Sequence, residues 1–140
     1  MTIEKTMLAA GLLLGGLLLG CGPSDGLSRA PLTGTVTYRG KPVDHGMIGL
    51  LPVDGTKGPQ GSAAIGPDGT YEVTTAGKPG AVIGTHKMVV QCRELVSESD
   101  ARQMKVGRLL TPRAYATYDT TPLKVNVPAE GTTLDIELRD

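Results

Sequence analysis

The 140-residue chain contains no phenylalanine and no tryptophan, and it has four tyrosines. A hydrophobic core built from this sequence must therefore rest on Val, Leu, Ile, Met, Ala and a few Tyr side chains. Sugar-binding platforms usually use exposed tryptophan or tyrosine rings. The absence of tryptophan therefore speaks mildly against carbohydrate binding.

Net charge is also missing, because 14 basic residues balance 14 acidic ones. This balance argues against nucleic acid as a partner and against a polybasic membrane-binding patch. The two histidines, His45 and His86, stand apart from any cluster with metal-ligand spacing. The chain also lacks a G-x-S-x-G motif and a phosphate-binding loop. We therefore expect no metal, no cofactor, no nucleic-acid partner and no enzymatic activity.

The first apolar run is too short to cross a bilayer. It covers residues 7–19, whereas a membrane helix needs about 20 apolar residues. Its length suits the hydrophobic region of a secretory signal peptide, which has about 7–15 residues. At its end, Leu18, Leu19 and Gly20 stand directly before Cys21. This arrangement resembles the lipobox of bacterial lipoproteins; the alternatives are a plain signal peptide and an uncleaved anchor.

The lipobox resemblance implies cleavage before Cys21, a diacylglycerol thioether on its sulfur and a palmitate-type acyl chain on its new amino group. Residues 1–20 would then be a signal peptide, and residues 21–31 the lipidated cysteine and a polar, flexible tether. Several acyl chains hold a protein on a membrane far better than one chain does. Gly22, rather than Asp, follows the cysteine. By resemblance to known sorting signals, this favours the outer membrane or the cell surface over the inner membrane.

The remaining residues, 32–140, have the size of one domain and the pattern of short strands. Apolar and polar side chains alternate with a period of two, and 20 glycines and 10 prolines supply turns between the runs. This pattern predicts an all-β sandwich of seven strands. The expected strands cover residues 32–38, 47–51, 62–65, 70–75, 82–92, 123–127 and 134–138.

Alternation along the fifth run predicts which of its side chains face the core. It points His86, Met88, Val90 and Cys92 inward, and Lys87 outward. Cys92 is then a small buried hydrophobic residue rather than a reactive thiol. If Cys21 is lipidated, Cys92 also has no partner for an intrachain disulfide.

Residues 93–117 interrupt the strand pattern and predict a long crossover loop. Ser97 followed by Asp100 resembles a capping box, which favours a short helix there. Tyr115 and Tyr118 are expected to be exposed on this crossover, and they are our candidates for contact with a ligand.

Four motifs resemble carboxypeptidase regulatory-like domains, which are relatives of the transthyretin sandwich. They are LTGTVTYRGKPV at residues 32–43, GMIGLLP at 46–52, DGTY at 68–71 and GTHKMVV at 84–90. The resemblance implies a seven-stranded sandwich of the transthyretin-like or Ig-like type. It also implies an accessory or adhesive role rather than an activity.

Together these features predict a membrane-anchored envelope lipoprotein that acts as a non-catalytic structural or protein-binding module. Its expected partner is another envelope protein or a glycan. Two alternatives stay open: a carbohydrate-binding module and a transthyretin-like hydrolase. The hydrolase would need His45 or His86 to be accessible and close to an arginine or a serine.

Overall fold

The computed structural model describes residues 24–140. The expected signal peptide and the lipobox residues Leu18, Leu19, Gly20 and Cys21 lie outside the described residues. The described residues form thirteen short strands, one α-helix and one 3₁₀-helix. The expected all-β class is therefore confirmed.

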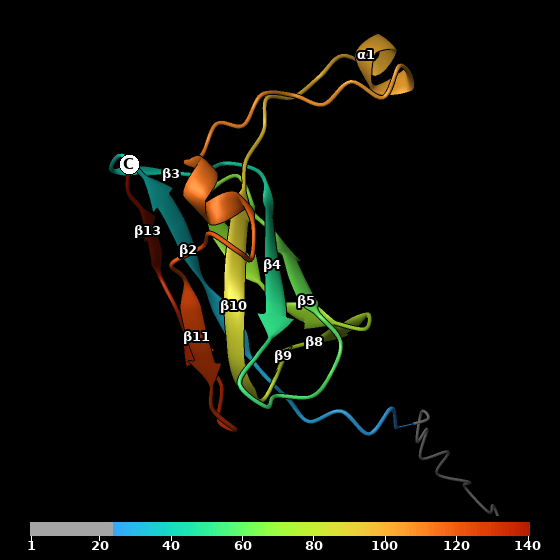
Figure 1. Ribbon diagram of the computed structural model, residues 1–140, viewed down its shortest axis with the longest axis vertical. Coiled ribbons are helices and arrows are strands. Elements are labelled where there is room, and N and C mark those ends of the chain that lie inside the picture. The colour runs from blue at the N-terminus through green and yellow to red at the C-terminus, as the bar shows by residue number, and fades with distance from the viewer. Residues whose placement is uncertain (1–23) are drawn as a thin grey trace, which may run out of the picture.

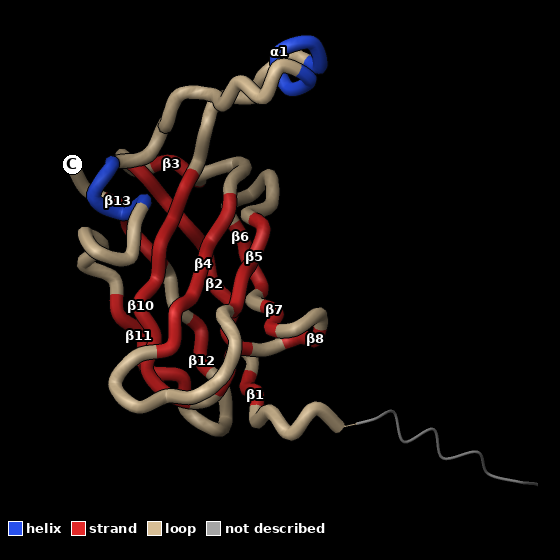
Figure 2. Tube along the Cα trace, turned by 45° about the vertical axis from the view of Figure 1, so that its right-hand side comes forward, coloured by secondary structure: helices blue, strands red, loops and turns tan. Residues whose placement is uncertain are grey.

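Two principal sheets build the domain (Figure 1 and Figure 2). The first is antiparallel, with the order β11 (Lys124–Val127), β10 (Gly84–Gln91), β4 (Met47–Pro52), β5 (Gly61–Ala64), β7 (Thr74–Thr75) and β8 (Lys78–Pro79). The second is built on β2 (Leu32–Tyr38), which pairs in parallel with β12 (Thr132–Thr133) and β13 (Ile136–Leu138) and antiparallel with β3 (Lys41–Pro42) and β6 (Thr70–Glu72).

The core lies between these sheets and follows the predicted alternation. Strand β2 contributes Leu32 and Val36, and β4 contributes Ile48 and Leu50, all of them buried. Strand β10 turns His86, Met88 and Val90 into the same interior, and Cys92 follows them just beyond its end. The inward face expected for residues 86–92 is confirmed, so a sandwich core forms without Phe or Trp.

The run at residues 70–75 differs from the expected single strand, because it divides between the two sheets. Its first part, β6, pairs with β2, and its last part, β7, pairs with β5. Val73 lies between them and is fully buried; its N–H donates to Leu32 O at 3.0 Å and its carbonyl accepts from Gly80 N at 2.8 Å. The run at 82–92 is interrupted at Ile83, and in the run at 134–138 the strand begins only at Ile136. The seven expected runs therefore appear among a larger number of short strands.

The N-terminal segment joins the fold earlier than expected. Strand β1 (Arg29–Ala30) pairs with β9 (Ala81–Val82), and Ala30 is buried. Strand pairing therefore begins at Arg29, three residues before the expected domain start at Leu32.

Strand β10 runs from the end of the sandwich that holds the N-terminal segment to the end from which the crossover leaves. Strands β1 and β9 lie beside its beginning, and the crossover leaves from its end at Gln91. Eight residues of strand span about 27 Å. Figure 1 accordingly shows the N-terminal segment and the crossover at opposite ends of the sandwich.

Candidate functional site: a projecting arm and its groove

Residues 93–110, which we call the arm, leave the sandwich as two legs joined at the tip by α1 (Glu98–Arg102), as Figure 2 shows. The legs pair where they start: Arg93 bridges to Leu109, and Glu94 N donates to Arg108 O at 2.9 Å. Leu110 N donates to Cys92 O at 2.7 Å. The arm is thus a two-stranded extension beyond β10 rather than an unstructured crossover, while the short helix expected near Ser97 is confirmed.

The tip of the arm is closed by local hydrogen bonds at both ends of α1. At the first end, Ser97 Oγ accepts from Asp100 N at 3.2 Å, which is the N-cap that the sequence indicated. At the other end, Met104 N donates to Ala101 O and Lys105 N donates to Asp100 O, both at 3.0 Å. This pair of bonds is a Schellman motif. None of the residues of α1 is buried, so these bonds rather than core packing shape the tip.

Met104 occupies the position of that motif where glycine is usual. Its φ is +58°, in the left-handed region, which costs a residue with a side chain about 1 kcal/mol. Its side chain gains no burial in exchange, because the residue is 89% exposed. Met104 thus goes against two ordinary preferences, that of the left-handed backbone conformation for glycine and that of apolar side chains for burial. Residues that go against such preferences concentrate at functional sites.

Each acidic residue of the arm is paired with a basic residue of the arm. Glu94 pairs with Arg108 at 2.7 Å, Asp100 with Lys105 at 2.9 Å and Glu98 with Arg102 at 3.6 Å. The hydrogen bonds from Lys105 and Ser97 lower the pKa of Asp100, so this carboxylate stays ionised. Each acid of the arm therefore already has a cation beside it.

The arm also exposes several apolar side chains to solvent. Leu95 is 85% exposed and Val106 is 72% exposed; Met47, Val96 and Leu110 are exposed to a smaller degree. Together with Met104, these residues give the arm and the beginning of β4 six exposed apolar side chains, and exposed apolar surface is a mark of interaction sites when it is contiguous.

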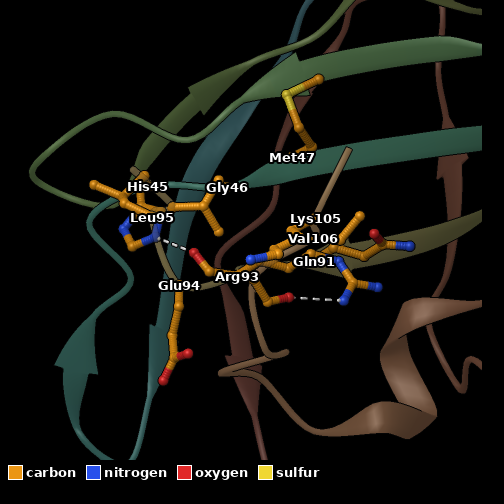
Figure 3. A pocket seen from close by; sticks show the side chains of 11 residues that line it. His45, Gly46, Met47, Gln91, Arg93, Glu94, Leu95, Lys105 and Val106 are labelled. Atoms are coloured by element: carbon orange, nitrogen blue, oxygen red, sulfur yellow. Dashed lines mark hydrogen bonds between the residues drawn. The ribbon is translucent and has the colours of Figure 1, made fainter. Parts of the chain in front are cut away.

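A groove of about 440 Å³ lies between the arm and the beginning of β4 (Figure 3). Its apolar wall is made by Met47, Leu95, Val96 and Val106. The polar side chains around it are His45, Gln91, Arg93, Glu94 and Lys105. A concave, mainly apolar site with a few polar groups at its edge is typical of binding sites.

His45 clamps the base of the arm to the rest of the domain. Its Nδ1 lies 2.6 Å from Asp44 Oδ1, and its Nε2 lies 2.7 Å from Arg93 O. Both partners are oxygens that accept, so the arrangement favours an imidazolium that donates from both nitrogens. The Arg93 carbonyl first, and then the Asp44 carboxylate, raise the pKa of His45.

The side chains of Asp44, His45 and Cys92 form a chain of contacts from carboxylate to imidazole to thiol, since Cys92 Sγ lies 3.4 Å from His45 Nε2. This order resembles the nucleophile, base and orienting acid of cysteine hydrolases. Here, however, His45 Nε2 is directed at the Arg93 carbonyl, and Cys92 is 4% exposed. Burial, and then the Asp44 charge, raise the pKa of the thiol. The geometry suits a structural clamp better than a nucleophile.

Sequence reasoning missed this contact because it joins residues 47 positions apart. The adjacency of Asp44 and His45 was its only local signal. The other histidine, His86, is buried as expected; its Nε2 donates to Val82 O at 2.7 Å, and its Nδ1 has no partner among the described residues. The accessible histidine that a hydrolase would need could therefore be His45 but not His86.

The two tyrosines singled out from the sequence have different surroundings. Tyr115 is on the 3₁₀-helix η1 (Arg113–Ala116), where it is 7% exposed and its hydroxyl accepts from Arg139 N at 3.1 Å. The expected exposure of Tyr115 is therefore wrong, because η1 packs this ring into the core. Tyr118 is half-buried beside Gly49 and lines a second groove of about 400 Å³ with Gln60, Ser62 and Gln91 among others. The structure thus separates the two residues that we had grouped.

Within residues 24–140, no three His, Cys, Asp or Glu side chains gather in a way that could hold a metal ion. No helix in this part of the chain is long and apolar enough to cross a membrane. Comparisons of the chain with protein-family models, with characterised proteins and with solved structures found no match.

The clamp predicts a pH dependence of stability. Folding raises the pKa of His45 from its ordinary value of 6.5. The stability that such a group contributes is fully present below pH 6.5. It is lost as the pH rises through the higher pKa of the folded protein. Substituting His45→Gln should therefore lower the free energy of unfolding more at about pH 5.5 than at about pH 9. Chemical denaturation of both chains at the two pH values measures the difference.

Asp44→Asn is the matched control, because it keeps His45 and an oxygen that can accept from it, and removes only the negative charge. The pH dependence should become smaller in that chain and persist in part through the Arg93 carbonyl. An equal effect of His45→Gln at both pH values would show that the clamp does not need a charged imidazole.

Proposed function

We propose that the protein is a lipid-anchored protein of the bacterial cell envelope that presents its arm as a protein-binding surface. The proposal joins two independent observations. The lipobox-like residues Leu18 to Cys21 indicate anchoring, and the exposed apolar arm indicates binding. We also propose that the sandwich is of the seven-stranded, transthyretin-like type, on the motifs at residues 32–43, 46–52, 68–71 and 84–90.

The direction of the arm supports this assignment. Cys21 precedes Arg29, the first residue paired with the sandwich, by eight residues, which reach at most about 28 Å when extended. The arm starts at the other end of β10 (Figure 1). An anchor at Cys21 would therefore hold the sandwich near the membrane and direct the arm away from it.

The observation that carries the binding function is the arm's composition. Each of its acids is paired with a basic residue of the arm, whereas Leu95, Met104 and Val106 face solvent. Exposed apolar surface is costly in water unless a partner covers it, at about 25 cal/mol per Å² of apolar area removed from water. A protein surface is the partner that this composition fits.

The anchor is tested by substitution of the cysteine. The native chain should start at Cys21 with the added mass of its acyl chains and should sediment with membranes, whereas Cys21→Ser should lose both properties. Intact mass and membrane fractionation measure them. Cys92→Ala is the matched control, because it removes the buried cysteine and should leave the lipid mass unchanged. Recovery of an unlipidated native chain in the soluble fraction would contradict the anchor.

The binding surface is tested by a cysteine placed on the arm. Val106→Cys in the full chain should yield a cross-linked protein product in intact membranes with a short cross-linker that joins its thiol to an amine of the partner, because Val106 lines the groove and is exposed. Ala129→Cys is the control, since this exposed residue lies in the turn between β11 and β12. Monomers alone from both chains would contradict a binding role for the arm.

Carbohydrate binding is a second candidate, favoured by the groove beside Tyr118. Ser62, Gln60 and Gln91 supply hydroxyl and amide groups there, of the kind that bind sugar hydroxyls. Tyr118→Ala should then abolish retention on envelope polysaccharide. Tyr115→Ala is no longer informative, because it would open a cavity in the core. Unchanged retention in Tyr118→Ala would remove this candidate.

A further inference from the structure

We propose that the arm's partner is a second copy of this chain, with Met104 of each copy packed into the groove of the other around a two-fold axis. This inference rests on the proposed binding function and names its partner. One chain carries both halves of the contact: Met104 projects at the tip of the arm, and the groove opens at its base. Around a two-fold axis each copy would supply one projection and one recess, so the same contact would form twice.

The exposed apolar area is large enough for such a dimer. The five apolar residues of the arm and Met47 are 38% to 89% exposed. Complete burial of these six residues in both copies would give an interface on the order of 1,200 Å², the lower end of stable interfaces. The polar residues around the groove would add to this area.

Electrostatics also favour a copy of the same chain. The full sequence has no formal net charge, so no long-range repulsion keeps two copies apart. The arm carries both signs in neighbouring positions, with Glu98 beside Arg102 and Glu94 beside Arg108. Such a mixed surface offers each copy both signs of charge to pair with.

The groove leaves apolar contact as its main means of recognition. His45 is bound to Asp44 and to the Arg93 carbonyl, and Lys105 is bound to Asp100. These polar groups are already engaged, and the wall between them is aliphatic. Methionine suits such a site because its flexible side chain fills irregular apolar spaces.

A lipid surface is a poorer occupant than a protein. The tip carries Glu98 paired with Arg102 and Asp100 paired with Lys105, so these four side chains offer anionic headgroups no net positive charge. The arm also lies at the end of the sandwich remote from β1, so a dimer through the arms leaves both N-terminal segments free.

The test uses the full chain in its own membranes. The product cross-linked through Val106→Cys should have twice the mass of one lipidated chain. Its yield should fall at least about tenfold when Met104→Gly is added, and Met104→Leu should restore it. Glycine suits the positive φ of Met104, so Met104→Gly removes the side chain without loss of the fold.

Unfolding measurements on the Met104→Gly chain separate loss of contact from loss of structure. A second variant, Leu95→Lys, places a charge in the groove and should lower the yield similarly, whereas Ala129→Lys should not. A product that contains a different protein would overturn the dimer and keep the binding function. Monomers alone would overturn both, and a homodimer whose yield ignores Met104→Gly would overturn the packing of Met104 into the groove.

Discussion

The pairing of β10 with β4 is the contact on which both the sandwich and the arm depend. Six residue pairs join the two strands, from His86 with Pro52 to Gln91 with Met47. This register turns Met88 and Val90 into the core and delivers the chain at Cys92 to the place where the arm begins. It also places Met47, the first residue of β4, in the wall of the groove. The same strand pair therefore positions both the core side chains and the wall of the groove. A shift in the register of β10 against β4 would displace both.

The arm is stabilised in a different way from the rest of the domain. The sandwich depends on burial between two sheets, whereas the arm depends on hydrogen bonds and ion pairs among its own residues. Exposed ion pairs contribute little each, so the legs and the two caps of α1 must carry most of its order. His45 adds the link to the body, because it holds the Arg93 carbonyl from a residue outside the arm. The arm can therefore expose its apolar side chains to water, because its order does not depend on burying them.

The sequence predicted strands and their inward faces correctly where apolar and polar residues alternate without interruption. Strand β2 has the predicted bounds Leu32–Tyr38, and the inward face of residues 86–92 is as predicted. The capping signal at Ser97 likewise gave the helix. Contacts between distant residues had no such signal. The clamp joins His45 to Cys92, the 70–75 run changes sheets at Val73, and η1 buries Tyr115, each through tertiary packing that composition and alternation do not encode.

The central claim is that the arm is a fixed extension of the sandwich, so its apolar surface is held in place for a partner. Hydrogen exchange of individual amides tests this most directly. The amides of Glu94 and Leu110 donate across the two legs at the base. If the account is right, they exchange far more slowly than an unstructured chain and lose part of that protection in His45→Gln. If they exchange as fast as an unstructured chain, the arm is not part of the scaffold, and its exposed side chains form no defined surface.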